Sequence, residues 1–126
     1  GFLLVRVPFE SHRRGRQLLH IWLLYHALRR GGATIHYYRT GTGREVDFVV
    51  TRRGGPRSLL QVCESLAIPQ ARDREITAVN EAMGELGLKS GTIVTRGESE
   101  TLTVGTGVIE VVPGWRFLLD LLLREE

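Results

Sequence analysis

Three short apolar runs between residues 33 and 65, separated by glycine-rich turns, constrain the fold of this chain more than any other feature. The runs cover residues 33–39, 44–50 and 58–65, and they are rich in the β-branched and aromatic side chains that favour strands. The turns "TGTG" and "TRRGGPR" between them are typical of hairpin connections. We therefore predict two successive hairpins, and we expect the third run, "SLLQVCES", to be buried on both faces of a sheet.

Helical patterns lie on both sides of these strands. Apolar residues recur about every 3.6 positions in residues 17–30 and 71–86, and glycine follows each segment. Two more strands are expected at 91–97 and 107–113, with a short one at "TLTV" between them, and a last helix follows Pro113. The order predicts an α/β fold, with a mixed central sheet flanked by helices.

Length and composition indicate one globular domain. The chain has 126 residues, of which 42% are hydrophobic and 25% charged, enough for one ordinary core. We assign residues 1–14 to a linker or an N-terminal strand and residues 15–126 to a single domain, expected to be a piece of a longer protein. The single cysteine excludes an intrachain disulfide and favours a reducing compartment, so we expect the cytoplasm. No apolar run is long enough to predict a membrane span.

Two carboxylates stand on the second strand, in "GREVDFVV". A carboxylate near a sheet interior costs several kcal/mol unless a partner compensates it. Because side chains alternate across a strand, we expect Glu45, Asp47 and Val49 on one face, and Gln61 and Cys63 together on a face of the third strand. Glu45 and Asp47 are candidate ligands for Mg²⁺ or Mn²⁺, which would activate water at a phosphate.

The order of elements and four segments resemble the PD-(D/E)xK nuclease superfamily, and more closely the nuclease-like C-terminal domain of archaeal and bacterial AAA-type ATPases. The segments are "YYRTGTGREVDFVV", "LLQVCESL", "ARDREITAVNEAMGELGLKSGTIVT" and "IEVVPGWRFLL". The resemblance runs from about residue 15 to the end. It implies a restriction-endonuclease-like fold and an ATPase portion in the same polypeptide.

The resemblance also implies site residues. Asp47 matches the metal-binding acidic residue of the second strand, the E-x-K of the third strand falls on Gln61-Val62-Cys63, and the glutamate of the first helix falls on His20. Gln61 brings no charge to a metal ion, and Cys63 carries no stable positive charge to polarise water. Three of the four functional positions differ from the family pattern, so we expect a degenerate hydrolytic site at Asp47, Gln61, Cys63 and His20.

Arginine dominates the basic residues, because Lys89 is the single lysine among 17. Guanidinium groups bind phosphate bidentately, so an arginine-rich surface is compatible with nucleic acid. It is equally compatible with an arginine-biased coding sequence and an ordinary solvated face. The candidate DNA contacts are Arg13, Arg14, Arg16, Arg39 and Arg44.

Three functions remain open from the sequence. The preferred one is a degenerate accessory domain of an AAA-type ATPase that binds DNA or a partner protein, because function resides in the site and this site has changed. The second is an active metal-dependent endonuclease that hydrolyses DNA phosphodiesters. The third is an assembly module that uses "WRFLLDLLL" to contact the ATPase or a second copy, which predicts an exposed apolar patch around Trp115, Phe117 and Leu121.

Overall fold

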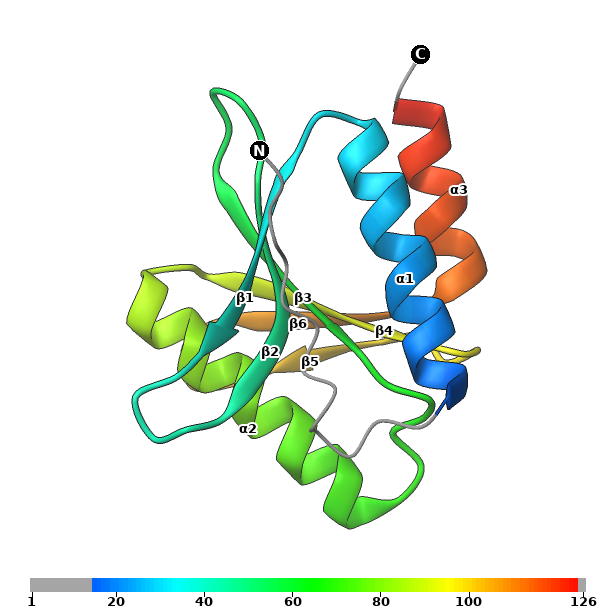
Figure 1. Ribbon diagram of the computed structural model, residues 1–126. Helices are drawn as coiled ribbons and strands as arrows, with labels where there is room; N and C mark the ends of the chain where they lie inside the picture. The colour runs from blue at the N-terminus through cyan, green and yellow to red at the C-terminus, as the bar shows by residue number, and fades with distance from the viewer. Residues whose placement is uncertain (1–14, 125–126) are drawn as a thin grey trace.

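A mixed six-stranded sheet with helices on both faces forms the molecule (Figure 1). The computed structural model describes residues 15–124, with side chains from 23 to 123. The helices are α1 (Gly15–Arg30), α2 (Pro69–Leu86) and α3 (Gly114–Arg124). The strands are β1 (Thr34–Arg39), β2 (Glu45–Thr51), β3 (Arg57–Val62), β4 (Ser90–Thr95), β5 (Glu100–Thr103) and β6 (Val108–Pro113). The predicted order of helices and strands is confirmed, including the short strand before the last one.

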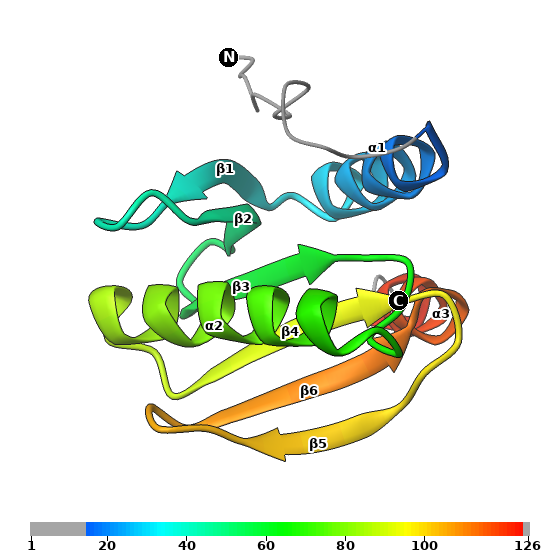
Figure 2. The ribbon, with the colours of Figure 1, turned by 90° about the horizontal axis from the view of Figure 1, so that it is seen from below.

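The strand order in the sheet is β1-β2-β3-β4-β6-β5. The first three strands pair antiparallel as two successive hairpins, β3, β4 and β6 pair parallel, and β5 returns antiparallel to β6. Parallel pairing of β3 with β4 needs a crossover connection, which α2 supplies. Figure 2 shows β3, β4, β6 and β5 fanning out in this order. This mixed α/β arrangement is consistent with the restriction-endonuclease-like fold expected from the sequence.

The sheet separates two apolar layers. One layer lies under α1 and α3, which run side by side, and the other lies under α2 (Figure 1). Strand β3 serves both layers: Leu60 and Val62 pack with α1 and α3, whereas Leu59 and Cys63 pack with Met83 of α2. The prediction that the third strand is buried on both faces is confirmed.

Glycines end the first two helices, as the sequence predicts. Gly32, just after α1, has a φ of 88°, and Gly87, the C-cap of α2, has a φ of 71°. Left-handed backbone of this kind costs glycine little because it has no Cβ. The Gly87 N–H donates to the carbonyl oxygen of Met83, and Pro69 occupies the first turn of α2, where its missing N–H costs nothing.

A bulge changes the side-chain alternation of β2. Cross-strand partners step from His36 with Val49 to Tyr38 with Val46, so two residues of β2, Asp47 and Phe48, lie opposite the single residue Tyr37 of β1. As a result Val46 and Val49 pack in the same layer under α2, although strict alternation would place them on opposite faces. The prediction that the odd-numbered residues of 45–49 share one face is therefore wrong.

Candidate functional site

Asp47 lies inside the bulge and is 2% exposed. Its Oδ2 accepts the N–H of Val62 at 2.8 Å, and its own N–H donates to Oε1 of Gln61 at 2.8 Å. The regular pairing of β2 with β3 reaches Phe48 and Leu60, and these two bonds carry the contact between the strands beyond that point. The structure thus brings Asp47 and Gln61 together between the two central strands.

Gln61 uses both ends of its amide group. Its Oε1 accepts from Asp47, while its Nε2 donates to the main-chain oxygen of Glu45 at 3.2 Å and to Oε1 of Glu75 at 2.7 Å. Glu75 comes from α2 and is 7% exposed. A neutral amide can donate to the Glu75 carboxylate, whereas a second carboxylate there would repel it. Asp47, Gln61 and Glu75 together form what we call the buried polar cluster.

Glu75 is the member of this cluster that the sequence reasoning missed. The sequence predicts a helix with an apolar face over residues 71–86, and the charged Glu75 was not assigned to that face. However, Glu75 lies three and four positions before Ala78 and Val79, both of which are buried. Residues at this spacing share a helix face, so the signal was present in the sequence.

The remaining candidate residues of the hydrolytic site are Glu45, Cys63 and His20. The Glu45 carboxylate forms an ion pair with Arg39 at 3.1 Å. Cys63 is buried in the apolar layer under α2, where its Sγ lies 3.9 Å from the carbonyl oxygen of Ser65. His20 lies on α1, and its side chain is outside the described residues.

Glu45 is also engaged with the edge strand β1. Burial, reinforced by a hydrogen bond with Glu45, raises the pKa of Tyr37 to about 12. Nη2 of Arg39 approaches the same hydroxyl at 3.4 Å. Glu45 therefore belongs to a partly exposed Tyr37–Arg39–Glu45 group on the β1–β2 hairpin.

One oxygen of each member of the buried polar cluster is engaged in a hydrogen bond within the protein. Mg²⁺ takes oxygen ligands in near-octahedral geometry and depends on carboxylates. Here Asp47 Oδ2 and Gln61 Oε1 accept main-chain N–H groups, and Glu75 Oε1 accepts the Gln61 amide. Among the side chains of residues 23–123, no three of His, Cys, Asp or Glu are grouped to hold a metal ion. The assignment of a Mg²⁺ or Mn²⁺ site to this cluster stays a prediction.

The described candidate DNA contacts are paired with carboxylates. Arg39 pairs with Glu45 at 3.1 Å, and Arg44 pairs with Glu81 at 3.3 Å. The other three candidates, Arg13, Arg14 and the side chain of Arg16, lie outside the described residues. DNA contact by this set stays a prediction.

A cavity of about 270 Å³ lies at the carboxyl ends of β3 and β4, between α1 and α3. Most of its lining is apolar, and it is formed by Leu23, Leu24, Val62, Cys63, Val94, Thr95, Arg96, Gly114, Trp115 and Leu118. Ligand sites of open α/β sheets favour this edge. The volume is below the range of sites for drug-sized ligands, and its lining offers few polar groups.

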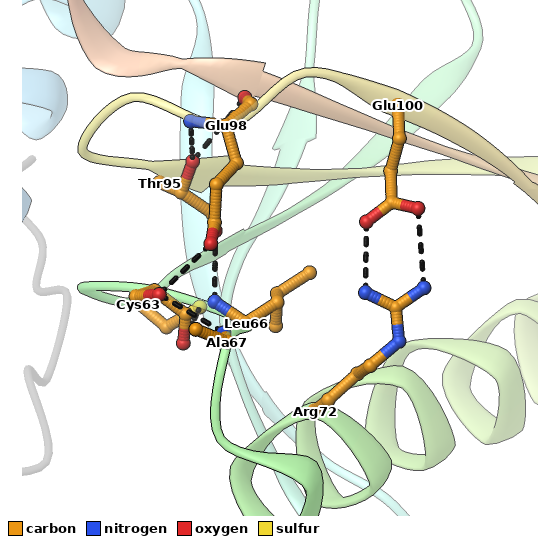
Figure 3. Close-up of polar contacts among 8 residues, drawn as sticks. Cys63, Leu66, Ala67, Arg72, Thr95, Glu98 and Glu100 are labelled. Atoms are coloured by element: carbon orange, nitrogen blue, oxygen red, sulfur yellow. Dashed lines mark hydrogen bonds and ion pairs between the residues drawn. The ribbon is translucent and has the colours of Figure 1, made fainter.

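Glu98 fixes the loop that enters α2 beside this cavity (Figure 3). Its carboxylate accepts the hydroxyl of Ser65 and the N–H of Leu66, each at 2.8 Å, while its own N–H donates to Thr95 Oγ1 at 2.9 Å. Nearby, Arg72 of α2 makes a two-pronged ion pair with Glu100 at 2.8 and 3.1 Å. These contacts tie the β3–α2 connection to the start of β5.

An apolar stripe on α3 is exposed. Trp115 is 66% exposed, as predicted, but Leu121 is buried and Phe117 is half-buried against α1 and the sheet. The predicted patch is therefore wrong at two of its three residues, because the side of α3 that carries them faces the core. The exposed stripe consists of Trp115, Leu119, Leu122 and Leu123. Within the part of the chain that the structure describes, no helix has the length and apolarity to cross a membrane.

The sheet, its bulge and the buried polar cluster define a mixed α/β domain of restriction-endonuclease-like arrangement. The chain belongs to the family described as "Domain of unknown function (DUF4143)", which matches residues 22–117. None of the curated proteins compared with it matches.

One solved structure contains a chain of similar fold. It is described as the refined half-complex from the tetradecameric assembly of Thermococcus gammatolerans McrB AAA+ hexamers with bound McrC. The similarity has a TM-score of 0.53 at 9% sequence identity and covers 82% of this chain. This chain corresponds to 32% of the other, about a third of its length. At this identity the likeness concerns the fold alone.

Proposed function

We propose that this domain is a nuclease-fold accessory domain of an AAA-type ATPase, related to the PD-(D/E)xK superfamily, that binds DNA or a partner protein and has a degenerate hydrolytic site. The observation that carries the proposal is Gln61, whose amide group bonds to Asp47, Glu45 and Glu75 in the place of a metal-binding carboxylate. The fold likeness to a chain of an assembly with AAA+ hexamers supports the association with an ATPase.

The chemistry of the surrounding groups supports binding over cleavage. Phosphodiester hydrolysis in such a site needs carboxylate ligands for the metal ion and a cation that orients or polarises the attacking water. Gln61 replaces a carboxylate and is engaged with Glu75, and the buried thiol of Cys63 stands where a lysine would. No step of hydrolysis is therefore assigned to these residues.

The loss of cleavage is tested with the full-length gene product and its Asp47→Asn variant. Asparagine keeps an oxygen that can accept the N–H of Val62, so the bulge is expected to persist. Plasmid and linear DNA are incubated with Mg²⁺ or Mn²⁺, and metal binding is measured by calorimetry. We expect no cleavage and no Asp47-dependent metal binding tighter than millimolar. Metal-dependent cleavage that disappears in Asp47→Asn would overturn the proposal.

The association with an ATPase is tested on the same gene product. We expect it to hydrolyse ATP, either by its own upstream sequence or through a co-purifying subunit, and to form oligomers visible by native mass spectrometry. If neither the gene product itself nor a co-purifying subunit hydrolyses ATP, this part of the proposal is contradicted. The proposed binding role would remain open.

A second candidate function is assembly with the ATPase through α3. The exposed stripe of Trp115, Leu119, Leu122 and Leu123 favours it, because monomeric proteins rarely leave such a continuous apolar surface uncovered. Substitution of Leu119 and Leu122 by glutamine, with the oligomeric state as the readout, tests this function.

A further inference from the structure

The tetrapeptide Arg-Arg-Gly-Gly occurs twice in this chain, at residues 29–32 and 52–55. The first copy ends α1, and the second forms the turn between β2 and β3. Thr34, two residues after the first copy, is the cross-strand partner of Thr51, which directly precedes the second. The fold therefore brings both loops to the same end of the sheet, the upper end in Figure 1.

Both loops present open backbone. Gly32 and Gly54 have φ values of 88° and 71°, and a Cβ added at each would meet no atom within 4 Å. Main-chain groups at such glycines can approach a ligand closely. The side chains of Arg29, Arg30 and Arg53 are exposed, and that of Arg52 is partly exposed.

These arginines differ from four others of the described residues, which form ion pairs with glutamates. Those four are Arg39, Arg44, Arg72 and Arg96. Among residues 23–123, the four arginines of the two tetrapeptides form no ion pair. Neither residues 11–44 nor residues 48–63 contain an aspartate or a glutamate. The segments that carry these four arginines therefore contain no carboxylate to balance their positive charge.

A fifth arginine extends the surface. Arg57 is the cross-strand partner of Thr51, and its Nη2 donates to the main-chain oxygen of Leu86, at the end of α2, at 3.2 Å. We call the two tetrapeptides together with Arg57 the arginine pole. A favourable interaction with the α1 dipole accounts for Arg29 and Arg30 in its last turn, but it does not account for a second pair on the neighbouring hairpin.

We propose that the arginine pole is a phosphate-binding surface that contacts the sugar-phosphate backbone of nucleic acid. This inference rests on the proposed binding function and names the surface that performs it. Guanidinium groups form two-pronged hydrogen bonds with phosphate oxygens, and glycines leave room for the backbone beside them. Contacts of this kind give affinity that depends strongly on salt and little on sequence.

The test compares pairs of arginine-to-glutamine substitutions in the full-length gene product. One variant carries Arg29→Gln with Arg30→Gln, and a second carries Arg52→Gln with Arg53→Gln. The control carries Arg72→Gln with Arg96→Gln, which removes the same charge from arginines that pair with glutamates. Circular dichroism confirms folding, and fluorescence anisotropy with a labelled random-sequence duplex measures affinity between low and moderate salt.

We expect each pole variant to bind the duplex about tenfold or more weakly, with a salt slope lower by about two, while the control stays within about twofold of the unsubstituted protein. Equal losses in the control and the pole variants would overturn the proposal. Duplex binding that both pole variants retain would overturn it too, although the proposed binding function would stand. A protein that binds no nucleic acid but captures a partner protein would reject the arginine pole and leave the partner-binding part of the proposed function intact.

Discussion

Gln61 is the single residue on which the central site depends. Its side chain connects β2, β3 and α2, since it bonds to the Asp47 N–H, the Glu45 carbonyl oxygen and the Glu75 carboxylate. An amide can accept at one end and donate at the other, whereas a carboxylate only accepts when ionised. Gln61 is thus matched to its present hydrogen-bond partners.

Gln61→Glu is predicted to destabilise the protein above neutral pH. It places a second carboxylate against Glu75, and this repulsion raises the pKa of one of the two. Because the folded protein then holds a proton that the unfolded chain releases, stability should fall as pH rises above about 4 and recover on acidification. We expect a loss of about 2–4 kcal/mol in the free energy of unfolding at pH 8 and a smaller loss at pH 5.

Urea unfolding at the two pH values measures this effect, with Gln61→Met as a variant of similar size that adds no charge. A Gln61→Glu protein as stable as the original at pH 8 contradicts the prediction. Millimolar Mg²⁺ that restores the stability of this variant would indicate that a single substitution recovers a metal site, because a ligand that binds the folded state stabilises it.

Tyr37 is predicted to titrate above the ordinary pKa of tyrosine. Its pKa is raised to about 12, mainly by burial and next by the hydrogen bond with Glu45. The interaction is fully present below the unfolded pKa of about 10 and is lost as pH rises through the folded value. The pKa of Tyr38 is raised as well, mainly by its hydrogen bond with Glu85. An ultraviolet titration of tyrosinate should therefore show a late component near pH 12 that Tyr37→Phe removes. A late component that persists in Tyr37→Phe argues against this assignment.

At the scale of elements, α2 packs closely on β4 at Gly91. A Cβ at this position would lie 2.7 Å from Cγ1 of Val79, which is fully buried. Contacts under 3 Å force a shift of the helix or of the side chain. The crossover helix thus depends on a glycine in the strand beneath it.

Gly91→Ala is therefore expected to reduce the free energy of unfolding by about 1–3 kcal/mol through overpacking. Gly97→Ala is the matched control, because a Cβ there would meet no atom within 4 Å, and it should change stability by about 0.5 kcal/mol or less. Thermal and denaturant unfolding of the two variants measures the difference. Equal stability of both would mean that α2 adjusts without cost.

The sequence predicts these elements well but their contacts less well. Periodicity and glycine turns locate the helices and strands because both are local signals. The bulge at Asp47 depends on how β2 pairs with β1, and the arrival of Glu75 depends on where the crossover helix packs. Both are tertiary properties, which alternation within one strand does not contain. The exposure of Leu119 in place of Leu121 depends in the same way on the side of α3 that meets α1.

At the scale of the whole molecule, the polar and apolar surfaces lie on different elements. The arginine pole is made by the end of α1 and the β2–β3 turn, while the exposed apolar stripe runs along α3. The two surfaces can therefore be altered separately. This separation allows nucleic-acid binding and assembly to be assigned to one or the other by substitution.

Substitution of Leu119 and Leu122 by glutamine is predicted to reduce assembly of the full-length protein without unfolding it. Both side chains are about half exposed, at 47% and 48%, so their loss should change stability by about 1 kcal/mol or less. Analytical ultracentrifugation should show smaller oligomers, and duplex binding should be unchanged. Arg116→Gln on the same helix serves as control. Unchanged oligomers in the leucine variant exclude α3 as the assembly surface.

The edge strand β5 has a consequence for the behaviour of the protein in concentrated solution. Within residues 15–124, β5 pairs with β6 alone, so in this part of the chain its outer side leaves main-chain donors and acceptors open to another chain. Its four residues offer few such groups, and Glu100 places a charge there that is held by Arg72 of α2. A strand of another chain that paired with this edge would form few main-chain hydrogen bonds and would have to accommodate the charge of Glu100. The short length of β5 and the charge of Glu100 therefore both oppose aggregation at this edge of the sheet.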